Sequence, residues 1–191
     1  MSPTPLQENL VKSNEKYAST FKEGHLALPP AKKYAVLTCM DARIDPASAF
    51  GITLGDAHVI RNAGASAKDA LRSLVISEQL LGTQEIILVK HTGCGMLTFQ
   101  NPDALGIVKS NLGEEGVKAV ADGFKGEFLP FPDLEKEVKS DVEWLKGNKA
   151  IPGSVEISGW VYEVETGKVM YGIMAVFGAE GGKDTTSRVK S

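Results

Sequence analysis

Two short stretches of the chain carry side chains that could bind a metal ion. The first is Cys39-Met40-Asp41-Ala42-Arg43 and the second is His91-Thr92-Gly93-Cys94-Gly95. Together they contain both cysteines of the 191-residue sequence and one of its three histidines. Two thiolates and one imidazole are a ligand set of catalytic zinc ions, which keep one coordination position open for water. We therefore predict a Zn²⁺ site formed by Cys39, His91 and Cys94.

The same residues have a simpler interpretation. Buried cysteines often act as small apolar core residues, and an isolated His-x-x-Cys motif also occurs by chance. The surrounding sequence favours a site, because residues 34–38 and 86–89 are apolar runs typical of strands buried on both faces of a parallel sheet. Each run leads directly into one of the two motifs. Ligands of open α/β sheets bind beyond the carboxyl ends of the strands, where these motifs are expected to lie.

An acidic and a basic side chain accompany the first cysteine. Asp41 and Arg43 are two residues apart, so in extended chain their side chains point to the same side and can pair. As a surface ion pair they would contribute little to stability. As part of a site, Arg43 would hold Asp41 near the metal ion but away from its coordination shell.

The elements that must position these residues predict an α/β fold. A further strand over residues 57–60 and a helix over 67–81 complete a β-α-β unit, whose crossover should be right-handed. The rest of the pattern indicates an amphipathic helix over 5–23, helical pieces in a loop over 98–126, a helix on the stripe Leu134, Val138, Val142 and Leu145, and strands over 155–164 and 169–176. We predict one domain over residues 1–191, with an N-terminal helical arm at 1–23 and a loose tail at 178–191.

Composition narrows the partners and the compartment. The chain has 42% hydrophobic and 24% charged residues and a net charge of −3, without a long run of one sign. This pattern argues against nucleic acid or an anionic membrane surface as the main partner. No stretch of 18 apolar residues and no secretion or mitochondrial signal is visible, so we expect a cytoplasmic protein. Two cysteines in a reducing compartment favour metal binding over a disulfide.

The motifs resemble those of a known family. The pattern Cys-x-Asp-x-Arg at 39–43 followed by His-x-x-Cys at 91–94 is similar to the signature of the β-class carbonic anhydrases. Residues 55–64 resemble the family's second-strand segment, which ends in an Arg-Asn pair, and residues 158–167 resemble its late strand and turn. The likeness spans roughly residues 30–176, so it implies the zinc ligands and the Asp-Arg pair named above.

Two departures from the family pattern concern the substrate site. Plant-type members have a substrate-binding glutamine near the position of Pro30, and members with an inhibitory bicarbonate pocket have a tryptophan at the position of Val36. The middle segment is also shorter than in most members. The resemblance therefore does not carry the substrate-binding residues or the regulation over to this chain.

The resemblance implies a fold and an assembly. We expect a mainly parallel four-stranded sheet with an antiparallel edge strand, flanked by helices. We also expect a homodimer or a dimer of dimers, in which the helix over residues 5–23 wraps the partner subunit. A plain packed helix is the alternative for that segment.

The expected reaction is the reversible hydration of carbon dioxide to bicarbonate. Zinc lowers the pKa of its bound water, and the resulting hydroxide attacks a small linear substrate. Asp41 would accept a hydrogen bond from the hydroxide while Arg43 fixes the carboxylate. In the family, this Asp can also bind the zinc when the Arg releases it. Because two thiolates cancel the charge of the ion, we expect a water pKa above the value of about 7 found in a three-histidine carbonic anhydrase.

Two other functions stay open. Some family members with the same zinc ligands hydrolyse carbonyl sulfide to hydrogen sulfide and carbon dioxide. The width of the pocket near zinc would decide between carbon dioxide and carbonyl sulfide as the substrate. A non-catalytic zinc or redox-sensing scaffold would need a closed site with a fourth ligand. His25 and His58 have no motif context, so a closed site would have to use Asp41.

Overall fold

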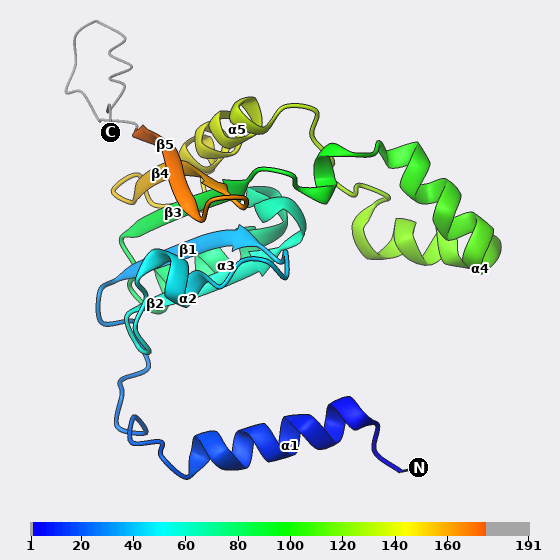
Figure 1. Cartoon of the computed structure of the whole chain (residues 1–191). Coiled ribbons are helices and arrows are strands. Elements are labelled where there is room, and N and C mark those ends of the chain that lie inside the picture. Colours follow the sequence, from blue (N-terminus) through cyan, green and yellow to red (C-terminus); the bar gives the residue numbers. More distant parts are fainter. Residues whose placement is uncertain (1, 175–191) are drawn as a thin grey trace, which may run out of the picture.

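The computed structural model of the chain describes residues 2–174 (Figure 1). The predicted loose tail at 178–191 lies outside the described residues, and so does the end of the strand predicted over 169–176. Among the residues that are described, no helix combines the length and the apolar character needed to cross a bilayer.

A five-stranded sheet forms the centre of the fold, in the order β2-β1-β3-β4-β5. The strands are β1 (Tyr34–Cys39), β2 (Ala57–Asn62), β3 (Glu85–His91), β4 (Glu156–Glu163) and β5 (Lys168–Met174). Strands β1 to β4 run parallel, and β5 pairs antiparallel with β4 at one edge. The predicted architecture of four parallel strands with an antiparallel edge strand is therefore confirmed.

Within residues 2–174, five α-helices accompany the sheet: α1 (Pro5–Ala18), α2 (Pro46–Phe50), α3 (Ala67–Gln79), α4 (Asn101–Phe124) and α5 (Leu134–Gly147). Helices α3 and α5 lie where the hydrophobic spacing predicted them, whereas α1 is shorter than the predicted helix over 5–23. Helix α2 was not predicted, because five residues are too few to show a helical period. It begins at Pro46, where the Asp45 side chain accepts a hydrogen bond from the Ala47 amide.

Helices α3 and α5 cover one face of the sheet. Side chains alternate along each strand, so Ala35, Leu37, Ile86 and Leu88 share one face and join a core with α3 and α5. Helix α5 approaches β4 closely because Gly159 has no side chain. A Cβ atom there would lie 2.5 Å from Cγ1 of Val138.

Residues 98–126, predicted as helical pieces in a loop, form mostly one long helix, α4. It is broken at Gly113, whose φ of 69° and ψ of −163° are not helical, and none of its residues is buried. Figure 1 shows α4 projecting from the side of the sheet. The glycines in this segment lower its helix propensity, which explains why the sequence pattern was ambiguous.

Helix α1 also stands apart from the sheet. Thr4 caps its first turn in a capping box with Gln7, but the helix has no buried residue. In Figure 1 it lies well away from the strands, joined to β1 by an extended segment. Its apolar side chains Leu6, Leu10 and Val11 are therefore exposed, and Tyr17 contacts only the nearby ring of Phe21 among the aromatic residues that the structure describes.

Candidate metal centre

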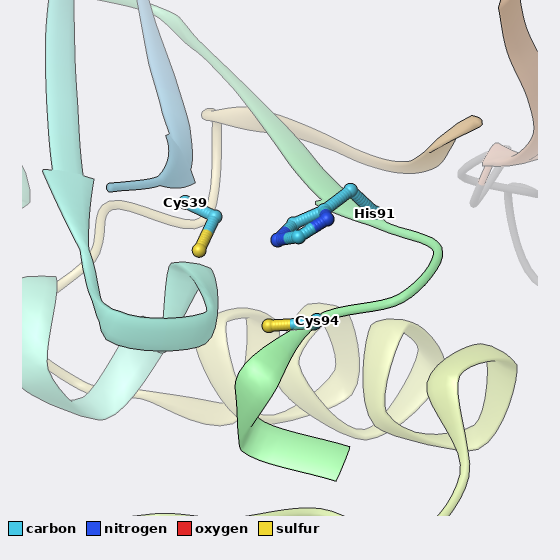
Figure 2. A group of neighbouring side chains, drawn as sticks. All are labelled: Cys39, His91 and Cys94. Atoms are coloured by element: carbon cyan, nitrogen blue, oxygen red, sulfur yellow. The ribbon is translucent and has the colours of Figure 1, made fainter. Parts of the chain in front are cut away.

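The three predicted metal ligands converge at the carboxyl end of the sheet. Cys39 is the last residue of β1 and His91 is the last residue of the neighbouring parallel strand β3. Cys94 follows three residues later, just before the short 3₁₀ helix η2 (Gly95–Leu97). Their ligand atoms all lie within 4.8 Å of one another, and the three side chains point toward one position (Figure 2). All three residues are buried, with at most 4% of their surface exposed.

The imidazole shows that this group is suited to a metal ion. His91 Nδ1 lies 2.8 Å from the carbonyl oxygen of Thr92, which can only accept, so Nδ1 carries the proton. The other ring nitrogen, Nε2, is buried and has no hydrogen-bond partner among the described residues. Two ligands bound to a tetrahedral zinc at about 2.3 Å lie about 3.8 Å apart, so ligand atoms within 4.8 Å of one another can reach one ion with small side-chain shifts. The donor set and its geometry therefore fit Zn²⁺.

The two thiols strongly affect each other's ionisation in the metal-free protein. A hydrogen bond from the Cys94 thiol to the Cys39 sulfur lowers the pKa of Cys39 to about 4 and raises the pKa of Cys94. The backbone amides of Asp41 and Gly64 also face the Cys39 sulfur and favour its thiolate. Burial is the largest single effect and lowers the pKa of His91, but the Cys39 sulfur, the Thr92 carbonyl and the Asp41 carboxylate together raise it above its usual value. A cation bound at this position would stabilise the Cys39 thiolate.

Asp41 and Arg43 form the predicted pair beside this pocket. Asp41 Oδ1 accepts hydrogen bonds from the Arg43 backbone amide and Nε, both at 2.9 Å, and Oδ2 accepts one from Nη2 at 2.7 Å. These bonds from Arg43 hold the pKa of Asp41 well below its usual range. Asp41 Oδ2 also lies 3.7 Å from His91 Nε2, so the carboxylate borders the metal position while both its oxygens bind Arg43.

A second arginine, Arg61, which was not predicted as a site residue, binds the backbone of the first motif. Arg61 near the end of β2 donates from Nε to the carbonyl oxygen of Cys39 at 3.0 Å and from Nη2 to that of Asp41 at 2.7 Å. Arg43 meanwhile donates to the carbonyl oxygen of Gly93 at 3.0 Å, which links the two motifs. The sequence signal for Arg61 was its place in the Arg-Asn pair of residues 55–64, the segment that resembles the family's second strand.

The turn between β4 and β5 contacts the site through Thr92. The Thr92 hydroxyl donates to Glu165 at 2.7 Å and accepts a hydrogen bond from the Val164 amide at 3.1 Å. The other two histidines lie elsewhere, since His58 contacts Ser77 and His25 contacts the Lys22 carbonyl. Neither belongs to the metal-binding group found among the described residues.

The fold and the site define a class of α/β proteins with a Cys-His-Cys metal site at the carboxyl ends of two neighbouring parallel strands. The chain belongs to the carbonic anhydrase family, whose pattern it matches over residues 34–169. The resemblance to the β class of that family, noted from the motifs, is confirmed by the relatives described next.

Known proteins similar to this chain include enzymes with two different names. It is 39% identical to β-carbonic anhydrase 1 of Mycobacterium tuberculosis over 165 residues, covering 85% of this chain and 94% of the relative. It is 34% identical to a carbon disulfide hydrolase of Acidithiobacillus thiooxidans over 158 residues, covering 74% and 78%. The solved structure of a carbonic anhydrase from Glaciozyma antarctica matches with a TM-score of 0.81 and 48% identity, covering 87% of this chain and 98% of that one.

Proposed function

We propose that this protein is a zinc enzyme that catalyses the reversible hydration of carbon dioxide to bicarbonate, with Cys39, His91 and Cys94 as the metal ligands. The observation that carries the proposal is the buried Nε2 of His91, which lies beside two cysteine sulfurs and has no hydrogen-bond partner in residues 2–174. The nearby carboxylate of Asp41, 3.7 Å from Nε2, supplies a hydrogen-bond acceptor at the same position. Membership of the carbonic anhydrase family supports the choice of reaction.

The roles of the chain's own residues follow from their contacts. When bound, zinc acidifies water, so that a nucleophile is available near neutral pH. Asp41 stays ionised because Arg43 holds its pKa low, so Asp41 can accept a hydrogen bond and orient that nucleophile but cannot act as a proton donor. Arg43 keeps the carboxylate away from the metal, and its own bond to Gly93 fixes the guanidinium against the second motif.

A second candidate reaction is the hydrolysis of carbonyl sulfide to hydrogen sulfide and carbon dioxide. The observation that favours it is the similarity to relatives named carbon disulfide hydrolase. Carbon dioxide, carbonyl sulfide and carbon disulfide are linear molecules with the same number of valence electrons. They differ only in the replacement of oxygen by the larger sulfur, so one site could attack the carbon atom of each.

The two reactions can be separated with one preparation. Purified, zinc-loaded protein would be assayed for carbon dioxide hydration with a pH indicator, and for sulfide release from carbonyl sulfide and carbon disulfide. The His91→Ala variant provides the background rate. We expect carbon dioxide hydration well above this background. Hydration at the background rate together with rapid sulfide release would show that the second reaction is the correct one.

We propose that the protein assembles as a homodimer, or as a dimer of such dimers, through the helical arm. Helix α1 exposes apolar side chains that include Leu6 (82% exposed), Leu10 (68%) and Val11 (56%). Burying one such side chain completely contributes about 1.5–3 kcal/mol, so covering this stripe with a second copy would stabilise a dimer.

We also assign the protein to the cytoplasm, because reducing conditions there keep both cysteines free to bind the metal.

The surface that accepts the arm is the face of the sheet opposite α3 and α5. A groove of about 680 Å³ lies there, lined mainly by Tyr34, Val36, Phe50, Ile87, Val89 and Trp160. We assign it to helix α1 of a second copy, because α1 of the same chain lies away from the sheet (Figure 1). Both surfaces are apolar, and covering each would remove it from water.

A further inference from the structure

A fully buried lysine lies directly before the histidine of the metal centre. Lys90 precedes His91 on β3 and is only 1% exposed. Neighbouring side chains of a strand point to opposite faces, so Lys90 lies on the face covered by α5 while His91 turns to the other. Burying an ammonium group is strongly unfavourable unless it is paired and hydrogen-bonded, so its surroundings need an explanation.

The Lys90 ammonium group is completely satisfied. Its Nζ lies 2.9 Å from Oδ2 of Asp141 on α5 and donates to the carbonyl oxygens of Gly64 at 2.8 Å and Ala65 at 3.1 Å. It also lies 4.8 Å from the centroid of the Phe131 ring. The three protons of an ammonium group thus have three oxygen partners on two different segments of the chain.

These contacts fix the loop between β2 and α3. Gly64 and Ala65 have φ values of 71° and 52°, the left-handed region, which is unfavourable for alanine. Ala65 is nevertheless completely buried. Asp141 accepts a further hydrogen bond from the amide of Ala67, the first residue of α3, at 3.2 Å. The Lys90–Asp141 pair therefore holds the strained turn and the start of α3 together.

The same loop contacts the metal centre. Asn62, the residue before this loop, is the register partner of Cys39, so the loop begins beside the first ligand, and the backbone amide of Gly64 favours the Cys39 thiolate. A Cβ atom on Gly64 would lie 2.8 Å from Cγ of Met96, which lies in η2 two residues after Cys94. The loop thus packs closely against η2, which begins directly after Cys94, and a shift would move the Gly64 amide relative to Cys39.

We propose that Lys90 is a positioning residue for the metal centre: with Asp141 as its counter-ion, it holds residues 63–65 so that the Gly64 amide donates a hydrogen bond to the Cys39 sulfur. This inference rests on the proposed zinc function. A hydrogen bond to a metal-bound sulfur fixes the ligand and withdraws electron density from it. Partners of this kind typically contribute about 10–100-fold to metal affinity.

The first test replaces Lys90 by methionine in the full chain, which keeps the length of the side chain but removes its charge and donors. Zinc affinity is measured by competition with a chelator, and the sulfur-to-metal charge-transfer band is recorded after substitution with Co²⁺. We expect zinc affinity to fall about tenfold or more. We also expect the band to move to lower energy, because a sulfur without the hydrogen bond gives up its electrons more easily.

A matched control separates this role from general destabilisation. Ser77→Ala removes the buried hydrogen bonds of Ser77 to His58 and Thr83, none of which belongs to the metal-binding group. This variant should lower the melting temperature but leave zinc affinity and the cobalt spectrum unchanged. Unchanged affinity and spectrum in Lys90→Met would overturn the proposal, whatever its melting temperature.

A double variant covers the case in which Lys90→Met alone does not fold. Lys90→Met combined with Asp141→Leu replaces the whole buried pair by apolar groups, a change that often restores stability. A positioning role predicts a folded protein with weakened zinc binding and the shifted band, whereas a purely structural role predicts that both recover. Wild-type protein that binds no zinc would contradict the proposed function itself, and normal zinc binding in the folded double variant would contradict only the role of Lys90.

Discussion

Glu78 is a buried carboxyl group without a partner, and its removal should change how stability depends on pH. It lies on α3, is 7% exposed, and neither carboxyl oxygen has a hydrogen-bond partner among the described residues. Burial raises its pKa to about 7. We predict that Glu78→Gln, which resembles the protonated side chain in shape and charge, is more stable than the wild type at alkaline pH.

The sign and the size follow from the pKa difference between the folded and unfolded chain. The unfolded carboxyl has a pKa near 4.5 and the folded one near 7, so between these values the folded state holds more protons. The free energy of unfolding therefore falls as pH rises through this interval and levels off above it. At about 1.4 kcal/mol per pH unit, the loss amounts to about 3 kcal/mol.

The measurement is urea-induced unfolding of both proteins at pH 5 and pH 8.5, followed by tryptophan fluorescence. Glu78→Gln should exceed the wild type by less than about 1 kcal/mol at pH 5 and by up to about 3 kcal/mol at pH 8.5. Glu115→Gln, on the exposed surface of α4, is the matched control and should follow the wild type at both pH values. A constant difference between Glu78→Gln and the wild type at both pH values would refute the reasoning.

Other predictions concern the site and the assembly. Elemental analysis should find one zinc per chain in the wild type, and full retention of zinc in Cys39→Ser or His91→Ala would contradict the ligand assignment. Arg43→Ala should lower kcat/KM about 100-fold, because Asp41 is then free to bind the metal, while its melting temperature changes little since the Arg43 side chain is 54% exposed; normal turnover would argue against this role. Deleting residues 1–23 should shift the dimer toward monomer in analytical ultracentrifugation, and an unchanged sedimentation profile would exclude the arm from the interface. The value of kcat/KM should rise with pH as the nucleophile forms. A plateau already complete at pH 6 would show that the two thiolates do not raise the pKa of the metal-bound water.

Much of the fold could be predicted because its signals are local. Strands β1 and β3 are buried on both faces, so each is a continuous apolar run that stands out in the sequence. Helices α3 and α5 show a regular apolar stripe because each packs one side on the sheet. The prediction failed for α2, which is too short to show a helical hydrophobic period. It was incomplete for α4, which has no buried residues that would create such a period.

The approach of Cys39, His91 and Cys94 also followed from sequence, together with the pairing of Asp41 with Arg43. Parallel strands end at the same edge of a sheet, so residues that directly follow two adjacent strands must lie near each other. The short spacings within each motif then restrict how far its side chains can separate.

Only the tertiary structure revealed the groups that support this site. Lys90 would be read as a solvent-facing residue at the end of a strand, yet packing of α5 brings Asp141 to it and buries both. Arg61 binds the carbonyl groups of the first motif because β2 lies beside β1 in the sheet. A buried charge needs a partner from a distant segment, and that partner's position depends on how the helices and strands pack, which no local pattern encodes.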